Sequence, residues 1–516
     1  MVATLAHNRH NWKNQFYELD MVQFQHTHSC QRGATGAGRY IYDLLRAQIS
    51  DGTLPAGARA PSTRGLATEL GVSRTTVTAA YEQLAAEGYL ATSTGRVARV
   101  AKSLTTTSTS ELPTPHRTKS APTLSEFGCR LLEIGMPALP HAEPARFDFL
   151  YGAVAYRDFP TLAWRRAYQA ELLHQQHRLY YAAPEGDPSL RSAIQGYLRR
   201  ARGLACNAEQ ILVVHGSQQA IDLCARLLLS ADDAFVFEDP GYLMARSCFQ
   251  ATGARCLATP VDRQGLDTSS LPQDKTARLV YVTPSHQFPL GGVLPITRRH
   301  ELLQWARRQN AWIVEDDYDG EFRYGQRPID ALQSIDGDGR VIYVGTFSKT
   351  LSPQLRLGYL VLPPDLVPVF RQAKRMTDRH APVLEQRVLA SLIESGTYER
   401  HVRRMRRENE RRRGALMDAV ARHLPKDAQV GGTAAGLHVV LWLPFLRPKD
   451  EPELVAAARK VGVGIYPVST LFLGPESPSQ PRPAGFILGY ASLTVENIQQ
   501  GIQTLGRLIS TWSTMT

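Results

Sequence analysis

Apolar positions along this chain follow two different spacings. Between residues 39 and 87 they recur every three or four positions in three short stretches, which is the period of helices that bury one face. The first stretch ends at the turn residues Asp51 and Gly52. From about residue 147 onward, short β-branched runs alternate with helical stretches, which indicates an α/β sheet. We therefore expect a small helical unit followed by a large α/β unit.

Capping residues mark two short helices in the small unit. Ser62 is placed to cap a helix over residues 63–70, which stops at Gly71. Ser73 is placed to cap a second helix over residues 74–87. Two short helices joined by a turn predict a helix-turn-helix.

The second helix has an apolar and a polar side. The apolar side consists of Val77, Tyr81 and Leu84. Arg74, Thr75 and Thr76 then face outward at the N-terminus, where such a helix meets the base edges and phosphates of duplex DNA. A helical bundle without a ligand is the alternative interpretation.

Two runs after this helix, residues 89–92 and 97–100, predict a two-stranded wing. Its tip, Thr94-Gly95-Arg96, is basic. The net charge of +11 and the pI of about 9.4 agree with a polyanionic partner, although charge alone does not decide this.

Composition predicts the domain boundaries. Residues 1–37 are polar with little periodicity, and we expect a flexible extension. Residues 103–125 are rich in Ser, Thr and Pro, the composition of a flexible linker. The DNA-binding unit then spans residues 38–102, and the large domain spans residues 126–516.

Three motifs of the large domain follow predicted strands in order. A buried strand over residues 210–214 leads into Gly216-Ser217-Gln218, where a helix beginning near Gln218 offers N–H groups and hydroxyls to a phosphate. A strand over residues 234–238 leads to Tyr242. This tyrosine either packs in the core or stacks on a pyridine ring. Its place at the carboxyl end of a strand, where open α/β sheets bind ligands, favours stacking.

The third motif, Glu315-Asp316-Asp317-Tyr318-Asp319, directly follows an apolar strand. A carboxylate held against a pyridine nitrogen keeps that nitrogen protonated, so that the ring can accept electrons. A metal site is the alternative, but no His lies close by and no phosphate-metal motif accompanies the acids. We therefore expect no metal.

The loop between two short strands, residues 341–344 and 358–362, carries a lysine among hydroxyls. Thr346 and Ser348 precede Lys349, and an arginine follows seven residues later. Such a lysine can form a Schiff base beside an anchored phosphate, which is the chemistry of pyridoxal 5′-phosphate (PLP). A solvated loop lysine is disfavoured because the other expected partners occur upstream in order.

These motifs resemble two known families. The stretch Leu54-Pro55-x-Gly57-x-Arg59-x-Pro61-Ser62-x-Arg64, followed by Gly71-Val72-Ser73-Arg74-Thr75-Thr76-Val77, closely resembles the winged helix-turn-helix of GntR-type bacterial regulators. The motifs between residues 147 and 508 resemble fold-type I aminotransferases, an α/β domain with a smaller C-terminal α+β subdomain. The whole chain resembles the MocR-type (GabR-like) PLP-dependent transcriptional regulators.

The resemblance implies a role for each candidate residue. Lys349 would form the Schiff base, Asp316 would pair with the pyridinium nitrogen, and Tyr318 would donate to the ring 3′-oxygen. Tyr242 would stack on the ring, and Ser285 or Gln287 would approach its oxygen side. The phosphate would be held by Ser217, Gln218, Thr346, Ser348 and Arg356. The DNA contacts would be Arg64, Ser73, Arg74, Thr75, Thr76 and Arg96.

One departure bears on the ligand that the large domain senses. Aminotransferases of this type usually carry an arginine in the strand near the C-terminus that clamps the substrate carboxylate. That strand, residues 485–490, contains none, and Arg482 is the nearest. Amino-acid-sensing members also tend to carry an arginine just after the stacking tyrosine, where this chain has Leu243 and Met244. These departures weaken the case for an ordinary amino acid as the effector, and we expect PLP itself or a small amine or amino-acid-like molecule.

Three functions remain open. The favoured one is a DNA-binding regulator with weak or no transaminase activity. An active aminotransferase with an accessory DNA-binding module would need the missing carboxylate clamp. A structural helix-turn-helix protein with an inactive transferase fold would bind no PLP.

Other features refine this picture. We expect a homodimer, because fold-type I sites are usually completed by a second chain. No apolar run long enough for a membrane span or signal segment occurs, so we expect a soluble cytoplasmic protein. The six cysteines are scattered and predicted to be free thiols. The basic run over residues 399–413 predicts a long exposed helix, whose charged face is solvated or, as the alternative, contacts a DNA backbone.

Overall fold

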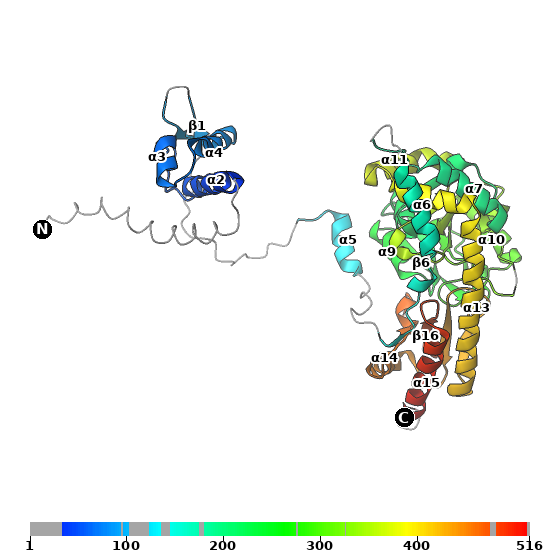
Figure 1. Cartoon of the computed structure of the whole chain (residues 1–516). Helices are drawn as coiled ribbons and strands as arrows, with labels where there is room; N and C mark the ends of the chain where they lie inside the picture. Colours follow the sequence, from blue (N-terminus) through cyan, green and yellow to red (C-terminus); the bar gives the residue numbers. More distant parts are fainter. Residues whose placement is uncertain are drawn as a thin grey trace. The chain divides into compact units, whose positions relative to one another are not determined.

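The computed structural model describes residues 34–93, 96–102, 123–135, 145–174, 180–274, 277–325, 327–474 and 481–512. Most of the predicted N-terminal extension and linker, and Thr94 and Gly95 of the predicted wing tip, lie outside the described residues. The chain divides into two compact units, Met1–Pro122 and Thr123–Thr516 (Figure 1). Each unit is described by itself.

The small unit contains the predicted winged helix-turn-helix. Its elements are α2 (Ala34–Ser50), α3 (Thr63–Glu69), α4 (Arg74–Ala86) and the antiparallel strands β1 (Leu90–Ala91) and β2 (Arg99–Val100). Helix α2 begins five residues before the predicted start at Arg39. The predicted caps are confirmed, since Ser62 Oγ accepts from the Gly65 N–H at 2.9 Å and Ser73 Oγ accepts from the Thr76 N–H at 3.1 Å.

The predicted apolar stripe of α4 is confirmed as well. Val77, Tyr81 and Leu84 are buried in one cluster with residues of α2 and α3. Leu84 is fully buried. The small unit therefore owes its fold to a single apolar core between three helices.

An eight-stranded sheet forms the centre of the large unit, with the strand order β4-β11-β10-β9-β8-β5-β6-β7. The strands are β4 (Ile211–Val214), β5 (Ala234–Asp239), β6 (Arg255–Asp262), β7 (Gly265–Leu266), β8 (Ala277–Val282), β9 (Trp312–Asp317), β10 (Val341–Thr346) and β11 (Gly358–Val361). Strand β11 runs antiparallel to β4 and β10, and β7 runs antiparallel to β6, while the other pairs are parallel.

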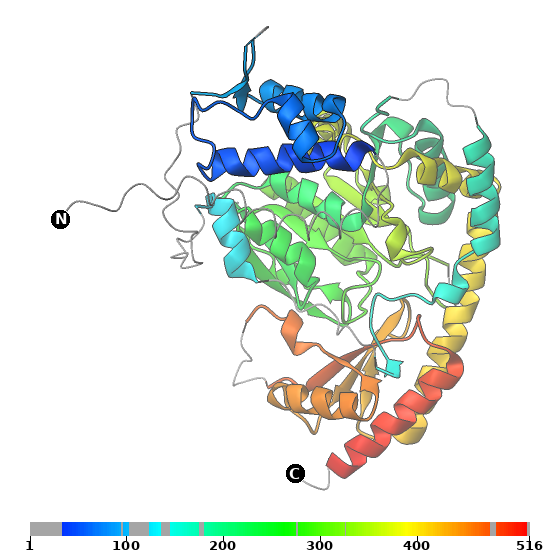
Figure 2. The ribbon, with the colours of Figure 1, turned by 60° about the vertical axis from the view of Figure 1, so that its left-hand side comes forward.

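Helices cover both faces of this sheet, as Figure 2 shows. They are α5 (Glu126–Ile134), α6 (Thr161–Leu173), α7 (Pro188–Arg202), α8 (Gly216–Leu228), α9 (Leu243–Ala251), α10 (Ile296–Gln309), α11 (Val367–Asp378) and α12 (Val383–Glu394). Along β10, Tyr343 packs into one apolar cluster with α7 and α12, whereas Ile342 and Val344 pack into another with α8. Burial on both faces explains why the strands read as continuous apolar runs.

A smaller C-terminal subdomain contains a four-stranded antiparallel sheet. Its strands are β12 (Gln429–Gly431), β13 (His438–Leu443), β15 (Tyr466–Pro467) and β16 (Ala484–Gly489), packed with α13 (Thr397–His423), α14 (Glu451–Lys460) and α15 (Val495–Trp512). Strand β14 (Val463–Gly464) pairs with β3 (Phe147–Asp148). This arrangement confirms the predicted α+β subdomain.

The prediction of an exposed basic helix is wrong for one face of α13. Met405 and Asn409 are buried, and the buried Arg412 guanidinium lies 2.7 Å from the Asp158 carboxylate. The apolar residues that α13 buries against its neighbours are spaced three to four positions apart, but the many arginines between them obscure this pattern in the sequence. Only the opposite face of α13 presents its arginines to solvent.

Two further findings concern the described part of the chain. None of its helices is both long and apolar enough to cross a membrane. Its cysteines are free thiols, namely Cys129, Cys206, Cys224, Cys248 and Cys256.

Candidate functional site

A cavity of about 490 Å³ lies at the carboxyl ends of the central strands. Its lining combines the ends of β8, β9 and β10 with the N-terminus of α8, the segment around Gly152 and the start of β13. Of the predicted cofactor residues, Ser217, Gln218, Tyr242, Asp316, Tyr318, Thr346, Ser348, Lys349 and Arg356 line it. Residues separated by up to 139 positions in the sequence (217 to 356) thus converge on one cavity.

Lys349 is held inside this cavity. Its Nζ atom donates to the Gly152 carbonyl oxygen at 2.8 Å. Gly152 has a φ of +81°, and a Cβ at this position would lie 3.1 Å from Nζ, so a side chain there would crowd the amine. Burial lowers the pKa of Lys349, while the charges of Asp319 and Asp316 oppose this shift. A larger fraction of Lys349 is therefore in the neutral amine form that a nucleophile requires than for a solvated lysine.

Asp316 lies at the end of β9, and only one of its two carboxylate oxygens accepts a hydrogen bond from a described residue. The Tyr281 hydroxyl donates to Oδ2 at 2.6 Å. Oδ1 is buried and has no hydrogen-bond partner among the described residues. Burial raises the pKa of Asp316 to about 7, which a cationic N–H beside Oδ1 would reverse. An unpartnered buried oxygen facing a cavity fits the protonated nitrogen of a pyridine ring.

Behind Tyr318 lies a histidine that the sequence analysis missed. His286 Nδ1 is 2.9 Å from the Tyr318 hydroxyl and 3.0 Å from the Asp319 carboxylate. Both His286 and Asp319 are almost fully buried. The pair therefore orients the Tyr318 hydroxyl at the wall of the cavity.

Ser285 and Gln287, the predicted contacts on the oxygen side of the ring, do not line the cavity. Ser285 Oγ accepts from Arg202 Nη2 at 2.9 Å, and Gln287 Nε2 donates to the Pro240 carbonyl oxygen at 2.9 Å. Both side chains are thus engaged with buried partners elsewhere. The segment between β8 and α10 directs these two side chains into the protein core, and His286, which lies between them in the chain, contacts Tyr318.

The end of the cavity beside the N-terminus of α8 and Arg356 carries groups that bind anions. Helix α8 begins at Gly216, two residues before the predicted start, so that Ser217 and Gln218 lie in its first turn. Arg356 Nη2 donates to the His215 carbonyl oxygen at 2.8 Å. A Cβ on Gly216 would lie 3.0 Å from this guanidinium, so the close approach requires glycine. Helix N–H groups, hydroxyls and one arginine are the groups that hold a phosphate.

Aromatic and histidine side chains form the remaining wall. The Tyr242 and Phe288 rings meet edge to face with centroids 5.8 Å apart, and Tyr151 packs on Phe288 at 5.6 Å. His438 of β13 also lines the cavity, and burial lowers its pKa to about 4, so it is neutral at physiological pH. Arg356 is the only arginine in the lining among the described residues. Apart from this predicted phosphate contact, the described lining therefore offers no arginine that could clamp a substrate carboxylate.

The predicted DNA contacts lie on the surface of the small unit. Arg64, Arg74 and Arg96 are exposed and form no ion pair among the described residues. The hydroxyls of Thr75 and Thr76 each lie 2.7 Å from Ser73 Oγ, so Ser73 is already engaged as the cap of α4. The arginines are thus the groups most available to a polyanion.

Comparison with known proteins accounts for both units. Residues 38–100 match the family model of bacterial regulatory proteins of the gntR family, and residues 151–505 match that of class I and II aminotransferases. The chain is 39% identical to the probable rhizopine catabolism regulatory protein MocR of Rhizobium meliloti, covering 90% of this chain and 92% of the relative. It is 33% identical to the HTH-type pyridoxine biosynthesis transcriptional regulator PdxR of Corynebacterium glutamicum, covering 82% of this chain and 86% of the relative.

Among solved structures, the chain resembles LysN, the α-aminoadipate aminotransferase of Thermus thermophilus, complexed with N-(5′-phosphopyridoxyl)-L-leucine. The TM-score is 0.64 at 29% identity, covering 72% of this chain and 93% of that one. The fold and the family indicate pyridoxal 5′-phosphate as the cofactor, and the open Asp316 oxygen, the buried Lys349 amine and the anion site fit it. The chain belongs to the MocR-type transcriptional regulators, which join a GntR-type helix-turn-helix to an aminotransferase-like domain.

Proposed function

We propose that the large unit holds PLP covalently on Lys349 and uses it to sense PLP itself or a small amine, while the small unit binds operator DNA. The observation that carries this proposal is that the Lys349 amine and the open Asp316 oxygen line the same cavity. When bound, PLP supplies an aldehyde that condenses with a primary amine and a ring that withdraws electrons.

In this proposal each side chain has a defined task. Lys349 provides the nitrogen for attachment, and Asp316 keeps a proton on the ring nitrogen. Tyr318, oriented by His286, donates a hydrogen bond at the ring's oxygen side, and Tyr242 covers the ring face. The phosphate would be held by Ser217, Gln218, Thr346, Ser348 and Arg356.

The class of effector follows from the absence of a second arginine among the described residues that line the cavity. An α-amino acid brings a carboxylate that aminotransferases of this type usually bind with a bidentate arginine. The lining offers Tyr151, Phe288 and the neutral His438 instead. A relative named for pyridoxine biosynthesis regulation also supports PLP as a signal. We therefore propose PLP or an amine without a carboxylate.

An active aminotransferase is the second candidate, favoured by the complete lysine and aspartate pair and by the LysN relative. A steady-state amination assay with common amino donors separates the two. Multiple turnovers per second would overturn the sensor proposal, whereas no turnover or a single half-reaction would support it.

We further propose a homodimer formed through the large unit. The support is a set of exposed large apolar side chains, including Leu172, Leu173 and Tyr156. Light scattering should show twice the chain mass at micromolar concentration. A monomer with PLP fully bound would refute the dimer.

Borohydride reduction tests the cofactor assignment directly. The purified protein should absorb in the visible, and reduction followed by peptide mass spectrometry should place the pyridoxyl group on Lys349. Labelling of a different lysine would overturn the site.

A further inference from the structure

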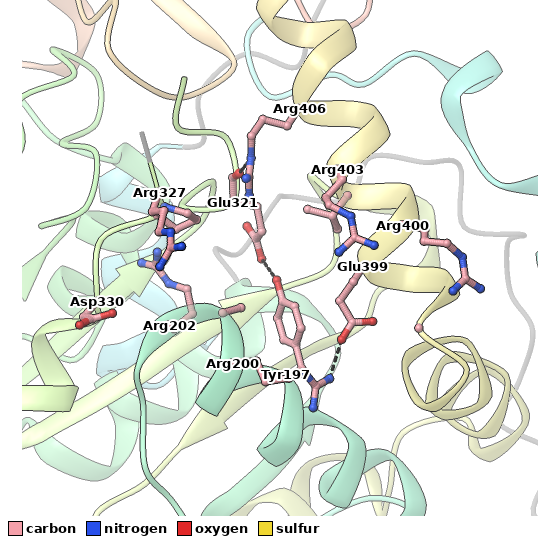
Figure 3. A pocket seen from close by; sticks show the side chains of 14 residues that line it. Tyr197, Arg200, Arg202, Glu321, Arg327, Asp330, Glu399, Arg400, Arg403 and Arg406 are labelled. Atoms are coloured by element: carbon pink, nitrogen blue, oxygen red, sulfur yellow. Dashed lines mark hydrogen bonds and ion pairs between the residues drawn. The ribbon is translucent and has the colours of Figure 1, made fainter. Parts of the chain in front are cut away.

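A second cavity, of about 610 Å³, lies in the large unit and shares no lining residue with the PLP cavity. It is lined by α7, by the segment after β9 and by the first turns of α13, and it is open to solvent on one side (Figure 3). Six arginines line it, namely Arg200, Arg202, Arg327, Arg400, Arg403 and Arg406. Only three carboxylates join them, those of Glu321, Asp330 and Glu399.

Two of the six guanidinium groups are neutralised within the protein. Arg200 Nη2 lies 2.5 Å from the Glu399 carboxylate. Arg202 Nη2 lies 2.6 Å from the carboxylate of Asp317, and both groups are buried. Because their charges are balanced by these carboxylates, the two arginines have little charge to offer a ligand.

The other four have no carboxylate partner among the described residues. Arg406 Nε donates to the Glu321 carbonyl oxygen at 2.8 Å, and Arg400 Nη2 donates to Thr397 Oγ1 at 2.9 Å. Arg327 and Arg403 are exposed and form no hydrogen bond or ion pair within the described part of the chain. In Figure 3, Arg403 and Arg406 extend from α13 and Arg327 stands on the opposite side. Uncompensated positive charge therefore comes from two facing walls.

The start of α13 adds to this field. Gly396, which lines the cavity, precedes the first turn of this helix of 27 residues, and no side chain caps it. The N-terminus of such a helix carries a partial positive charge and free N–H groups. This feature reinforces the arginines.

Glu321, one of the three acidic residues in the lining, opposes the arginines less than a solvated carboxylate would. The buried Tyr197 hydroxyl donates to Glu321 Oε1 at 3.0 Å. Burial and the nearby Asp317 charge raise the pKa of Glu321, which favours its neutral form.

We propose that this cavity binds a small phosphorylated molecule, as a second ligand site separate from the PLP pocket. Guanidinium groups match phosphate oxygens in a bidentate geometry, and a group of them around a concave space suits several phosphates held close together. Duplex DNA, in contrast, is bound by arginines spread along an extended face, whereas these arginines surround one concave space of about 610 Å³. The ligand is therefore a small molecule rather than DNA.

The site lies directly behind the PLP pocket. Asp316 faces the PLP cavity, whereas its neighbour Asp317 binds Arg202 of the second cavity. Arg202 also donates to Ser285, next to His286. Polar contacts of Arg202 and residues adjacent in the chain thus connect the two sites.

Isothermal titration of the full-length, PLP-loaded protein with inorganic pyrophosphate tests the proposal. The wild type should bind with saturation, and the Arg327→Ala/Arg403→Ala double variant should bind at least about tenfold more weakly, the factor expected for one lost charge-assisted hydrogen bond. The matched control is Arg407→Ala, which removes an exposed arginine of α13 outside the cavity. Its affinity should equal that of the wild type, and the visible spectrum should be the same in all three proteins.

Three results would overturn the proposal. The first is absence of saturable pyrophosphate binding to the wild type, and the second is an equal loss of affinity in Arg407→Ala. The third is a double variant that keeps its pyrophosphate affinity while its DNA affinity or its dimerisation falls, which would identify this face as a macromolecular contact.

Discussion

The two surfaces with which this protein would meet its ligands are built in opposite ways. In the small unit, Arg64 and Arg74 are exposed and unpaired among the described residues, while the fold depends on a separate apolar core. In the large unit, Asp316 and Lys349 are held by partners within the interior. The difference implies that DNA contacts can be removed without harm to the fold. Cofactor contacts, in contrast, depend on each other's charge.

The most severe test of the interior site is Lys349→Ala. We expect complete loss of covalent PLP attachment, because no other lysine lines the cavity among the described residues. Absorbance spectroscopy with borohydride trapping measures it. Operator binding by the small unit should remain measurable, and a visible band that survives the substitution would refute the assignment.

Asp316→Ala should come next in size. Removing one partner of a buried charge pair costs about 3–5 kcal/mol, so PLP affinity should fall by at least a hundredfold. Titration of the visible absorbance with PLP gives the affinity and the protonation of the ring. Asp232→Asn, at an exposed position outside the cavity, serves as the control. Unchanged affinity and spectrum in Asp316→Ala would contradict the pairing.

Leu84→Ala tests whether the two units fold separately. Its side chain is fully buried, and truncation of a core leucine costs about 2–5 kcal/mol of the free energy of unfolding. A unit of this size has little stability to spare, so operator binding should be lost while the PLP spectrum remains. Urea denaturation followed by circular dichroism and visible absorbance separates the two transitions. Simultaneous loss of both signals would show that the units are coupled.

Arg74→Ala should have a smaller effect. If Arg74 reads a base, its removal costs about 1–3 kcal/mol of specific binding and relaxes sequence preference at one position. If it contacts only phosphate, affinity falls evenly across sequences and the salt dependence becomes shallower. Fluorescence anisotropy with operator and random duplexes at several salt concentrations distinguishes these outcomes. If the Arg64→Ala/Arg74→Ala double variant kept the operator affinity and the salt dependence of the wild type, this surface would not be the DNA-binding surface.

The smallest expected effect concerns pH. Burial lowers the pKa of Lys349 and Asp319 opposes this, so attachment of PLP should slow as pH falls through the lowered pKa. Asp319→Asn removes an opposing charge and should move this profile to lower pH, whereas Asp232→Asn should not. Stopped-flow absorbance measures the rates. Coincident profiles for wild type and Asp319→Asn would show that the two groups do not interact.

Local sequence signals predicted most elements and the residues at strand ends. Capping residues set the bounds of α3 and α4, and the short apolar runs became β5, β8, β9 and β10. Tyr151 and His438 were missed because they reach the cavity from segments that only the topology brings together, and His286 was missed because it acts through the Tyr318 hydroxyl behind the cavity wall. Ser285 and Gln287 were expected there from the family resemblance, but they do not line the cavity, because side-chain direction within a turn depends on tertiary partners such as Arg202.

The run Glu315-Asp316-Asp317 has a consequence for the alignment of β9 within its sheet. Neighbouring strand residues point to opposite faces, so Asp316 serves the PLP cavity and Asp317 binds Arg202. If each residue took the place of the next one along the chain, a carboxylate would still stand at both positions. Charge at these two positions therefore does not distinguish the native alignment from this slipped one. The slip would, however, replace the Tyr318 ring at the cavity by a carboxylate, and it would place Val314 where the Glu315 carboxylate accepts from the Leu332 and Gln333 N–H groups. The residues at the two ends of the acidic run therefore favour the native alignment.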